Sequence, residues 1–569
     1  MVDPLTLLPP AVVLVLAAVL VAVLPRRAGT PFGIGLPVVV ATWLAFVPEG
    51  VYLRTRLFGF DVALLHVDPF SRTVGLVLAF LAGAGIAYGY GTGSSRRQLS
   101  LSLLYLGAGL GAVFAGDWLT LVVAWEVLAV GATALVWVSG DASARRAGLR
   151  YAIYHELGGL ALLAAVLVHF TEAGTFLFDG GGLAGGLAAT LGLVGIGLNV
   201  GFVSLHPWLV DTYPRPHVAT SVVLAACTTK VGVYALARAF PDGGVLLAYL
   251  GGVMLVVGVT YAILQTDVRR LLSYHIVSQV GFMVAGIGIA SPLGVAGAFA
   301  HLVNNVLYKS LLFAVAGVLV VRTGESNLKR LGGLARPMPV TLAAFLVAAL
   351  AISGVPGFNG FVSKAMVVDA AEDAGLDVLW WLLVVGSVGT VVSFAKFGYY
   401  AFFHGDHGHD VADAGRMETL AFAALAIPCV VFGLVPALQF AVLPGSTEAA
   451  KPFATSQFVK AGAILAAGGV AFVLLRDALG RVSGVPDLDS VYHPAGNRLL
   501  WAGTVAVGET ASRLDSAVRR ATAAAIRVAS HPERLREEGP LGPVPDDSIG
   551  TGIALLVLAL VVVLGLLFV

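Results

Sequence analysis

The sequence is poor in charge. Only 12% of its 569 residues are charged, whereas soluble domains carry about 25%. Hydrophobic residues make up 58% of the chain. This shortage of charge excludes an ordinary soluble protein and predicts one that crosses a lipid bilayer many times. A net charge of +1 gives no electrostatic basis for binding nucleic acid.

The sequence also lacks cofactor and metal motifs. Its two cysteines, Cys227 and Cys429, both fall in apolar runs, so neither a disulfide framework nor a cysteine metal site is expected. Glycine-rich segments lack the strand–loop–helix context of a nucleotide-binding loop. Histidines and aspartates between His404 and Asp410 have no strict ligand spacing, and a solvated loop is the preferred interpretation. We therefore expect no cofactor and no resident metal.

Apolar runs long enough to span a bilayer recur along the chain, and we count about sixteen. The predicted fold class is an all-α polytopic membrane protein. The first run is followed, not preceded, by Arg26 and Arg27, which favours a spanning helix over a secretory signal. The runs lie near residues 11–25, 32–47, 68–91, 99–115, 118–139, 151–170, 185–205, 218–240, 246–265, 273–291, 294–321, 338–366, 379–403, 417–435, 458–475 and 550–568.

Basic and acidic connections alternate between these runs. Because positive residues favour the cytoplasmic side, we expect a multi-pass protein of the plasma membrane with its basic connections in the cytoplasm. An acidic connection, with Glu372, Asp373 and Asp377, is expected on the other side. The basic connections carry Arg26, Arg27, Arg96, Arg97, Arg145, Arg146, Arg150, Arg215, Arg269, Arg270, Lys329, Arg330 and Arg336.

Two of the long runs are interrupted. One breaks at His206-Pro207 and crosses a polar segment before residue 218; the other breaks between Gly354 and Gly360. Paired interruptions in two halves are typical of inverted-repeat transporters, so we expect two inverted five-helix repeats with discontinuous helices. The expected divisions are N-terminal helices at 1–98, repeats at 99–265 and 273–403, C-terminal helices at 404–475, a lateral segment at 476–549 and a final helix at 550–569.

The lateral segment is rich in arginine. It fits either an amphipathic helix along the membrane or neighbouring subunits, or a soluble cytoplasmic linker.

Ionisable residues at membrane depth are costly and usually functional. Glu126 and Lys230 lie in apolar runs. Burial favours the neutral form of a lysine, so Lys230 could alternate between charged and neutral forms. The structural alternatives are a hydrogen-bonded carboxyl and a lysine bound to carbonyls of a broken helix. His155 and Glu156 are interpreted as a solvated helix start.

A second set follows in the second half. His301, Asn305 and Lys309 stand at i, i+4 and i+8, a polar stripe about 12 Å long that could carry protons along water. Lys364 lies just past the second break and is favoured as functional, whereas Lys396 is nearer a helix end and could snorkel to the surface.

Several segments resemble one family in order. The stretch LHPWLVDTYPRPHVATSVVLAACTTKVGVYALAR, beginning at Leu205, resembles the signature of the antiporter-like membrane subunits shared by Mrp-type cation/proton antiporters and respiratory complex I. DVRRLLSYHIVSQVGFM, HLVNNVLYKSLLFAVAG and LAISGVPGFNGFVSK match further blocks, and the resemblance spans about residues 67 to 440. Within the family the sequence is most similar to the D subunit of the Mrp-type Na⁺/H⁺ antiporter.

The resemblance implies a proton relay of Glu126, Lys230, His301, Lys309 and Lys364. It also shows a departure: Asn199 stands where the family has the lysine that pairs with the glutamate at position 126. The first half could therefore work differently, with Lys230 partnering Glu126 directly, or conduct poorly.

We expect a secondary ion transporter subunit, not an enzyme, that moves protons in exchange for Na⁺ within a hetero-oligomeric complex in the lipid bilayer. Two alternatives remain open. One is a redox-driven proton-pumping subunit of a complex I-type NADH-quinone oxidoreductase or a membrane-bound hydrogenase, which the lateral segment and final helix favour. The other is a non-conducting scaffold or inorganic-carbon uptake partner, which Asn199 makes plausible.

Overall fold

The structure is a computed structural model that describes residues 9–405, 411–482 and Arg520. The predicted final helix at 550–569 and nearly all of the lateral segment lie outside these described residues, as do residues 406–410.

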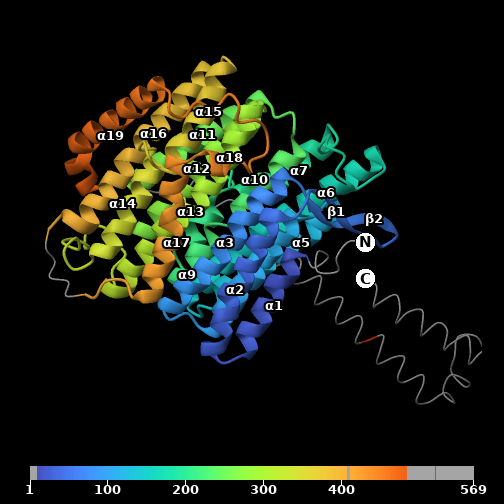
Figure 1. Cartoon of the computed structure of the whole chain (residues 1–569), viewed down its shortest axis with the longest axis horizontal. Helices are drawn as coiled ribbons and strands as arrows, with labels where there is room; N and C mark the ends of the chain where they lie inside the picture. Colours follow the sequence, from blue (N-terminus) through green and yellow to red (C-terminus); the bar gives the residue numbers. More distant parts are fainter. Residues whose placement is uncertain (1–8, 406–410, 483–519, 521–569) are drawn as a thin grey trace, which may run out of the picture. The chain divides into compact units, whose positions relative to one another are not determined.

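Helices dominate the described residues (Figure 1). Eleven helical segments among the described residues are long and apolar enough to cross a membrane, when Val218–Ala239 (α9 and α10) is counted as one segment, and three shorter helices, α1, α7 and α14, are also apolar. Every apolar run predicted between residues 11 and 475 falls on helices, which confirms the prediction of a polytopic helical protein. The helices are α1 (Pro10–Val23), α2 (Arg26–Phe46), α3 (Pro69–Gly91), α4 (Arg96–Val113), α5 (Trp118–Trp137), α6 (Ala142–Ala173), α7 (Leu187–Val200), α8 (Pro207–Thr212), α9 (Val218–Leu224), α10 (Thr228–Ala239), α11 (Val245–Leu264), α12 (Val268–Ile289), α13 (Pro292–Thr323), α14 (Pro339–Ser353), α15 (Asn359–Asp373), α16 (Asp377–Gly398) with a π-helical end (Tyr399–Phe403), α17 (Arg416–Leu434), α18 (Ala437–Phe440) and α19 (Thr455–Arg481).

A β-hairpin between α2 and α3 was not predicted. Strands β1 (Gly50–Leu57) and β2 (Phe60–Val67) pair antiparallel at the edge of the bundle (Figure 1). The two turn residues, Phe58 and Gly59, both have positive φ (52° and 87°), as a two-residue hairpin turn requires. Two backbone hydrogen bonds hold the hairpin against the helices: the N–H of His66 donates to the carbonyl of Phe114 at the end of α4, and the N–H of Gly116 donates to the carbonyl of Ala63.

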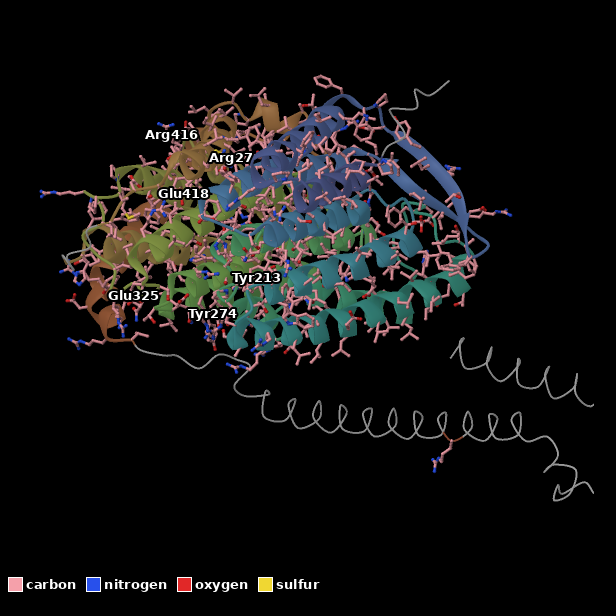
Figure 2. The ribbon with its side chains drawn as sticks, turned by 90° about the horizontal axis from the view of Figure 1, so that it is seen from below. Arg27, Tyr213, Tyr274, Glu325, Arg416 and Glu418 are labelled. Atoms are coloured by element: carbon pink, nitrogen blue, oxygen red, sulfur yellow. The ribbon has the colours of Figure 1, made fainter. Side chains whose placement is uncertain are left out.

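Successive crossings place the basic connections at one side of the bundle. The chain reverses direction at each connection between spanning helices, so the predicted basic connections all fall at one side, whereas the other side has single basic residues such as Arg72 near the start of α3 and Arg238 near the end of α10. Figure 2, which views the bundle from below, labels residues at several of the basic-side ends, among them Arg27, Glu325 and Arg416. The hairpin and the acidic α15–α16 connection belong to the opposite side.

Both predicted helix interruptions are present. Helix α7 ends at Gly201, whose φ of 81° is left-handed, and α8 begins with Pro207. The indole nitrogen Nε1 of Trp208 donates to the carbonyl of Leu198 at 2.9 Å, which satisfies one of the carbonyls freed at the end of α7. Helix α14 likewise ends at Gly354, with φ 75°, and α15 restarts at Asn359.

A third interruption separates α9 from α10 at residues 225–227, where a continuous helix was expected. No proline or glycine marks this break. Instead, Tyr105 compensates for it: its hydroxyl accepts from the backbone N–H of Thr228 at 2.9 Å and lies 2.6 Å from the Thr228 hydroxyl. Irregular backbone at membrane depth requires such internal partners.

Small residues bring helices α11 and α12 close together. A side-chain carbon at Gly258 would lie 2.5 Å from the backbone nitrogen of Ser278, and one at Gly288 would overlap the backbone nitrogen of Ala248. Close approach of this kind is typical of membrane helix pairs. This close packing sets the position of α12, which forms one wall of a buried polar region.

Candidate functional site

Lys230 lies in the first turn of α10, directly after the third interruption. It is fully buried. Its Nζ donates to the carbonyl of Ala225 at 2.8 Å and to the hydroxyl of Thr229 at 3.2 Å. The interruption thus supplies the carbonyl that binds the lysine. A lysine bound to carbonyls of a broken helix is the contact that the structural alternative for Lys230 predicts.

Lys309 lies on α13 and is also fully buried. Its Nζ donates to the carbonyl of Leu272 on α12 at 3.0 Å and lies 5.8 Å from the ring centre of Phe394 on α16. Lys309 therefore bridges three helices through one hydrogen bond and one aromatic face.

His301 connects α13 to α15. Its Nδ1 lies 3.0 Å from the hydroxyl of Ser363, and its Nε2 lies 3.2 Å from the hydroxyl of Tyr308. The amide of Asn305 reaches the same tyrosine hydroxyl at 3.4 Å. Ser363 directly precedes Lys364 on α15. The predicted polar stripe on α13 is therefore linked by hydrogen-bonding side chains to the helix that follows the second interruption.

Lys364 is 6% exposed, and its Nζ has no hydrogen-bond partner within the described part of the chain. The amine lies 5.2 Å from the ring centre of Phe282 and borders a cavity of about 50 Å³ between α14, α15, α16 and α19. Gly354, at the end of α14, lines the same cavity.

Four of the five predicted relay residues therefore share one buried region. The charge of Lys230 acts on both His301 and Lys309, and the charge of Lys364 acts on His301. Among the described residues, no carboxylate pairs with any of these three lysines, whose contacts are carbonyls, a hydroxyl and aromatic rings. Such a line of hydrogen-bonding and ionisable groups can pass protons between neighbouring members.

Glu126 stands apart from this line, and the structure does not pair it with Lys230, which was one of the two possibilities for the first half. Its carboxylate packs on α6, where a side-chain carbon at Gly159 would overlap Oε1. The charged side chain that influences the Glu126 carboxylate is Glu156 of α6. The reason is geometric: Nζ of Lys230 turns back to the carbonyl of Ala225 and does not reach α5.

Asn199 lies on α7 beside Gly232 of α10 and is 1% exposed. Its side-chain oxygen Oδ1 has no hydrogen-bond partner among residues 9–405 and 411–482. An unpaired buried amide oxygen is costly in a dry core.

The interpretation of His155 and Glu156 as a solvated helix start is wrong. Helix α6 begins at Ala142, more than three turns earlier, and places both residues inside the span. His155 is 1% exposed and stacks on Tyr151 with 3.7 Å between ring centres, whereas Glu156 lies on the exposed face.

The sequence reasoning missed His275 on α12. It is fully buried, neither ring nitrogen has a hydrogen-bond partner in the described structure, and the charges of Lys309 and Lys364 both act on it. Its spacing of four from Gln279, also fully buried, forms a second polar stripe that could have revealed it.

Lys396, by contrast, has a structural contact. Its Nζ donates to the carbonyls of Ile263 and Gln265 at 2.6 and 2.5 Å, at the C-terminal end of α11. A cation at this position complements the negative end of a helix dipole. Across the described residues, no group of three or more metal-ligating side chains is placed to hold a metal ion.

The broken helices and the buried line of lysines and histidines define an antiporter-like membrane subunit. Residues 115–393 match the family model described as NADH:quinone oxidoreductase/Mrp antiporter, TM. The chain is 30% identical over 389 residues to the D subunit of the Na⁺/H⁺ antiporter of Alkalihalophilus pseudofirmus, a match that covers 65% of this chain and 76% of that protein. It is also 30% identical over 367 residues to NAD(P)H-quinone oxidoreductase chain 4 1 of Synechococcus elongatus, covering 60% and 69% of the two chains.

A solved chain from the Mrp complex of Dietzia sp. DQ12-45-1b has the same fold, with a TM-score of 0.68 and 23% identity over 83% of this chain and 99% of that one. The chain belongs to the NADH:quinone oxidoreductase/Mrp antiporter family of membrane subunits. It is a multi-pass membrane protein.

Proposed function

We propose that this chain is the proton-translocating subunit of a multisubunit, Mrp-type antiporter that exchanges protons for a monovalent cation, Na⁺. The observation that carries the proposal is the line formed by Lys230, Lys309, His301 and Lys364, which is buried and has no carboxylate partner among the described residues. Similarity to the D subunit of the Alkalihalophilus pseudofirmus antiporter supports the choice of exchange reaction.

In this proposal the lysines take up and release protons in turn. Lys230 and Lys309 are the central members, the hydrogen bonds of His301 to Tyr308 and Ser363 extend the line from α13 to α15, and Lys364 serves the exit half. Glu126 retains an electrostatic role from α5, through its neighbour Glu156 and not through a contact with Lys230.

We further propose that the chain works with other subunits in the plasma membrane, with its basic connections in the cytoplasm. The cation itself could cross through a partner subunit, because the described part of the buried line offers it no carboxylate.

The test compares Na⁺-dependent proton movement in everted vesicles that contain the full complex. Lys230→Ala should abolish exchange. Lys230→Arg is the sharper variant, because a guanidinium keeps the positive charge and can donate to the Ala225 carbonyl but does not release its proton. Lys451→Ala, at an exposed lysine outside the line, is the control. Wild-type exchange by an assembled Lys230→Arg complex would refute the relay.

A redox-driven proton pump of the complex I type is the second candidate. The chain is 30% identical both to the antiporter D subunit and to the quinone oxidoreductase chain, and this equal identity supports a redox-driven pump as an alternative. Proton movement in the same vesicles that requires an electron donor and quinone, and ignores Na⁺, would select this candidate.

A further inference from the structure

The hydroxyl of Tyr105 on α4 makes two contacts with Thr228, the residue at which α10 begins. It accepts from the backbone N–H of Thr228 at 2.9 Å and lies 2.6 Å from the side-chain hydroxyl of the same residue. Tyr151 on α6 also approaches that side-chain hydroxyl, at 2.8 Å. All three residues are fully buried. The start of α10 is therefore tied to two other helices, and of the two tyrosines it is Tyr105 that contacts its backbone.

A continuous helix would use the same backbone groups differently. There the N–H of Thr228 would donate to the carbonyl of Leu224, and the N–H of Thr229 would donate to the carbonyl of Ala225. In the structure the Tyr105 hydroxyl binds the first of these N–H groups, and Nζ of Lys230 donates to the carbonyl of Ala225 at 2.8 Å. The side chain of Lys230 and a continuous helix therefore compete for one carbonyl.

Helix α4 contacts the interruption at a second place, about one turn after Tyr105. Gly109 leaves space there for the thiol of Cys227, because a side-chain carbon at residue 109 would overlap Sγ. Cys227 is the last residue before α10 and is fully buried. Helix α4 thus sets the position of the interrupted backbone through both a hydrogen bond and close packing.

We propose that Tyr105 is a positioning residue for Lys230: it binds the N–H of Thr228 and so keeps the carbonyl of Ala225 available to the lysine. This role rests on the proposed function, in which Lys230 is a central member of the relay. Tyr105 itself takes up and releases no proton. Without its hydroxyl, the buried N–H of Thr228 would lack a partner, and that cost favours joining α9 to α10. The N–H of Thr229 would then bind the carbonyl of Ala225, and Lys230 would lose this acceptor.

Tyr105→Phe in the full complex tests this role through the pH dependence of Na⁺-dependent proton movement in everted vesicles. A charged donor forms a hydrogen bond about twice as strong as a neutral one, so loss of the carbonyl disfavours the protonated lysine more than the neutral one. We expect the pH at which exchange falls to half on its alkaline side to move by about one unit toward acid. The titratable groups of the described residues that interact with the charge of Lys230 are Cys227, His301 and Lys309, and the variant leaves all three in place.

Tyr151→Phe and Thr228→Val are the matched controls. Each removes one hydroxyl from the same buried cluster, as Tyr105→Phe does, but leaves the hydrogen bond between the Tyr105 hydroxyl and the backbone N–H of Thr228. A general loss of packing would affect all three variants alike. We expect the pH profiles of the two controls to coincide with that of the wild type.

A second measurement does not depend on exchange. Electron cryo-microscopy of the assembled Tyr105→Phe complex should show that Nζ of Lys230 no longer contacts the carbonyl of Ala225. Either an unshifted pH profile or an intact contact would overturn the positioning role, as would an equal shift in the Tyr151→Phe complex.

Gly109→Ala takes the place of Tyr105→Phe if that variant does not assemble. The added methyl group displaces Cys227 and removes no hydroxyl. It should shift the pH profile, and the double variant with Cys227→Ala should restore it; an unshifted Gly109→Ala complex would count equally against the role.

The proposed function fails separately, because exchange by the Lys230→Arg complex is measured independently of Tyr105. Loss of the contact to Ala225 in Tyr105→Phe, together with wild-type exchange by Lys230→Arg, would leave Tyr105 as the residue that positions the lysine and remove the relay.

Discussion

Replacing Lys309 by methionine should separate transport from stability. Methionine has a similar length and lacks the ammonium, so the variant removes the titrating group and keeps most of the packing. We expect exchange to fall by at least about 100-fold, the usual contribution of a positioned proton-transfer group. The folded complex should remain.

The contacts of Lys309 determine how far its replacement changes the stability of the folded complex. The variant loses one charged hydrogen bond, to the carbonyl of Leu272, worth about 1.5–3 kcal/mol. It also removes the cost of burying an ammonium, several kcal/mol. Since Leu272 lies within α12, its carbonyl keeps its helical partner. The net change should lie within about 2 kcal/mol of zero, on the stabilising side.

Lys396→Met is the matched control, because it removes the same chemical group from a different setting. Two short hydrogen bonds to the end of α11 are lost, and both carbonyls lose the partner that satisfies the helix terminus. We expect a destabilisation of about 2–4 kcal/mol, with unchanged exchange per assembled complex.

The assays are Na⁺-dependent proton movement in everted vesicles, normalised to assembled complex, and the thermal midpoint of the purified complex. Wild-type exchange by Lys309→Met would exclude Lys309 from the proton relay. So would the reverse pattern, with Lys396→Met inactive and fully stable.

Two further predictions concern Asn199 and Asp68. Asn199→Lys should raise the exchange rate in vesicles if the missing lysine limits the first half, and an unchanged rate would rule out that limitation. Asp68 caps α3 and pairs with Arg238 at 2.5 Å; burial acts to raise the pKa of its carboxyl, but the positive charge of Arg238 outweighs it and holds the pKa below the usual value. A lowered carboxyl pKa adds stability that is present above the unfolded value and is lost as pH falls through the folded one, so Asp68→Asn should lower the thermal midpoint at neutral pH and flatten its decline below about pH 4. An unaltered acid decline would assign the effect to other groups.

The sequence carried strong signals for the spanning helices and two of the interruptions. Low charge and long apolar runs reveal crossings, and His206-Pro207 and Gly354–Gly360 mark breaks by their restricted or left-handed backbone. The break before Lys230 carries no such residue. It depends on the hydroxyl of Tyr105, which is 123 residues away in the chain, and local sequence does not encode a partner at that distance.

The sequence also could not predict which side chains of different helices lie close together. The residue types at 230, 301, 309 and 364 identified candidates, but which of them meet depends on packing. Glu126 faces α6 because Gly159 leaves space for its carboxylate. The different contacts of Lys309 and Lys396, two buried lysines in apolar runs, were likewise set by the neighbouring helices.

The interrupted helices have a consequence for the counter-charges of the buried line. Lys230 contacts the carbonyl at the end of α9, and Lys364 lies beside the end of α14, where aligned peptide dipoles leave partial negative charge. Peptide carbonyls do not take up protons at any physiological pH, so this compensation stays constant while the lysines change state. A carboxylate in the same place could take up the migrating proton. It would then lose its negative charge and no longer attract the ammonium of the lysine. The helix ends therefore provide constant partial negative charge, and within the described part of the line only lysines and histidines change their protonation state.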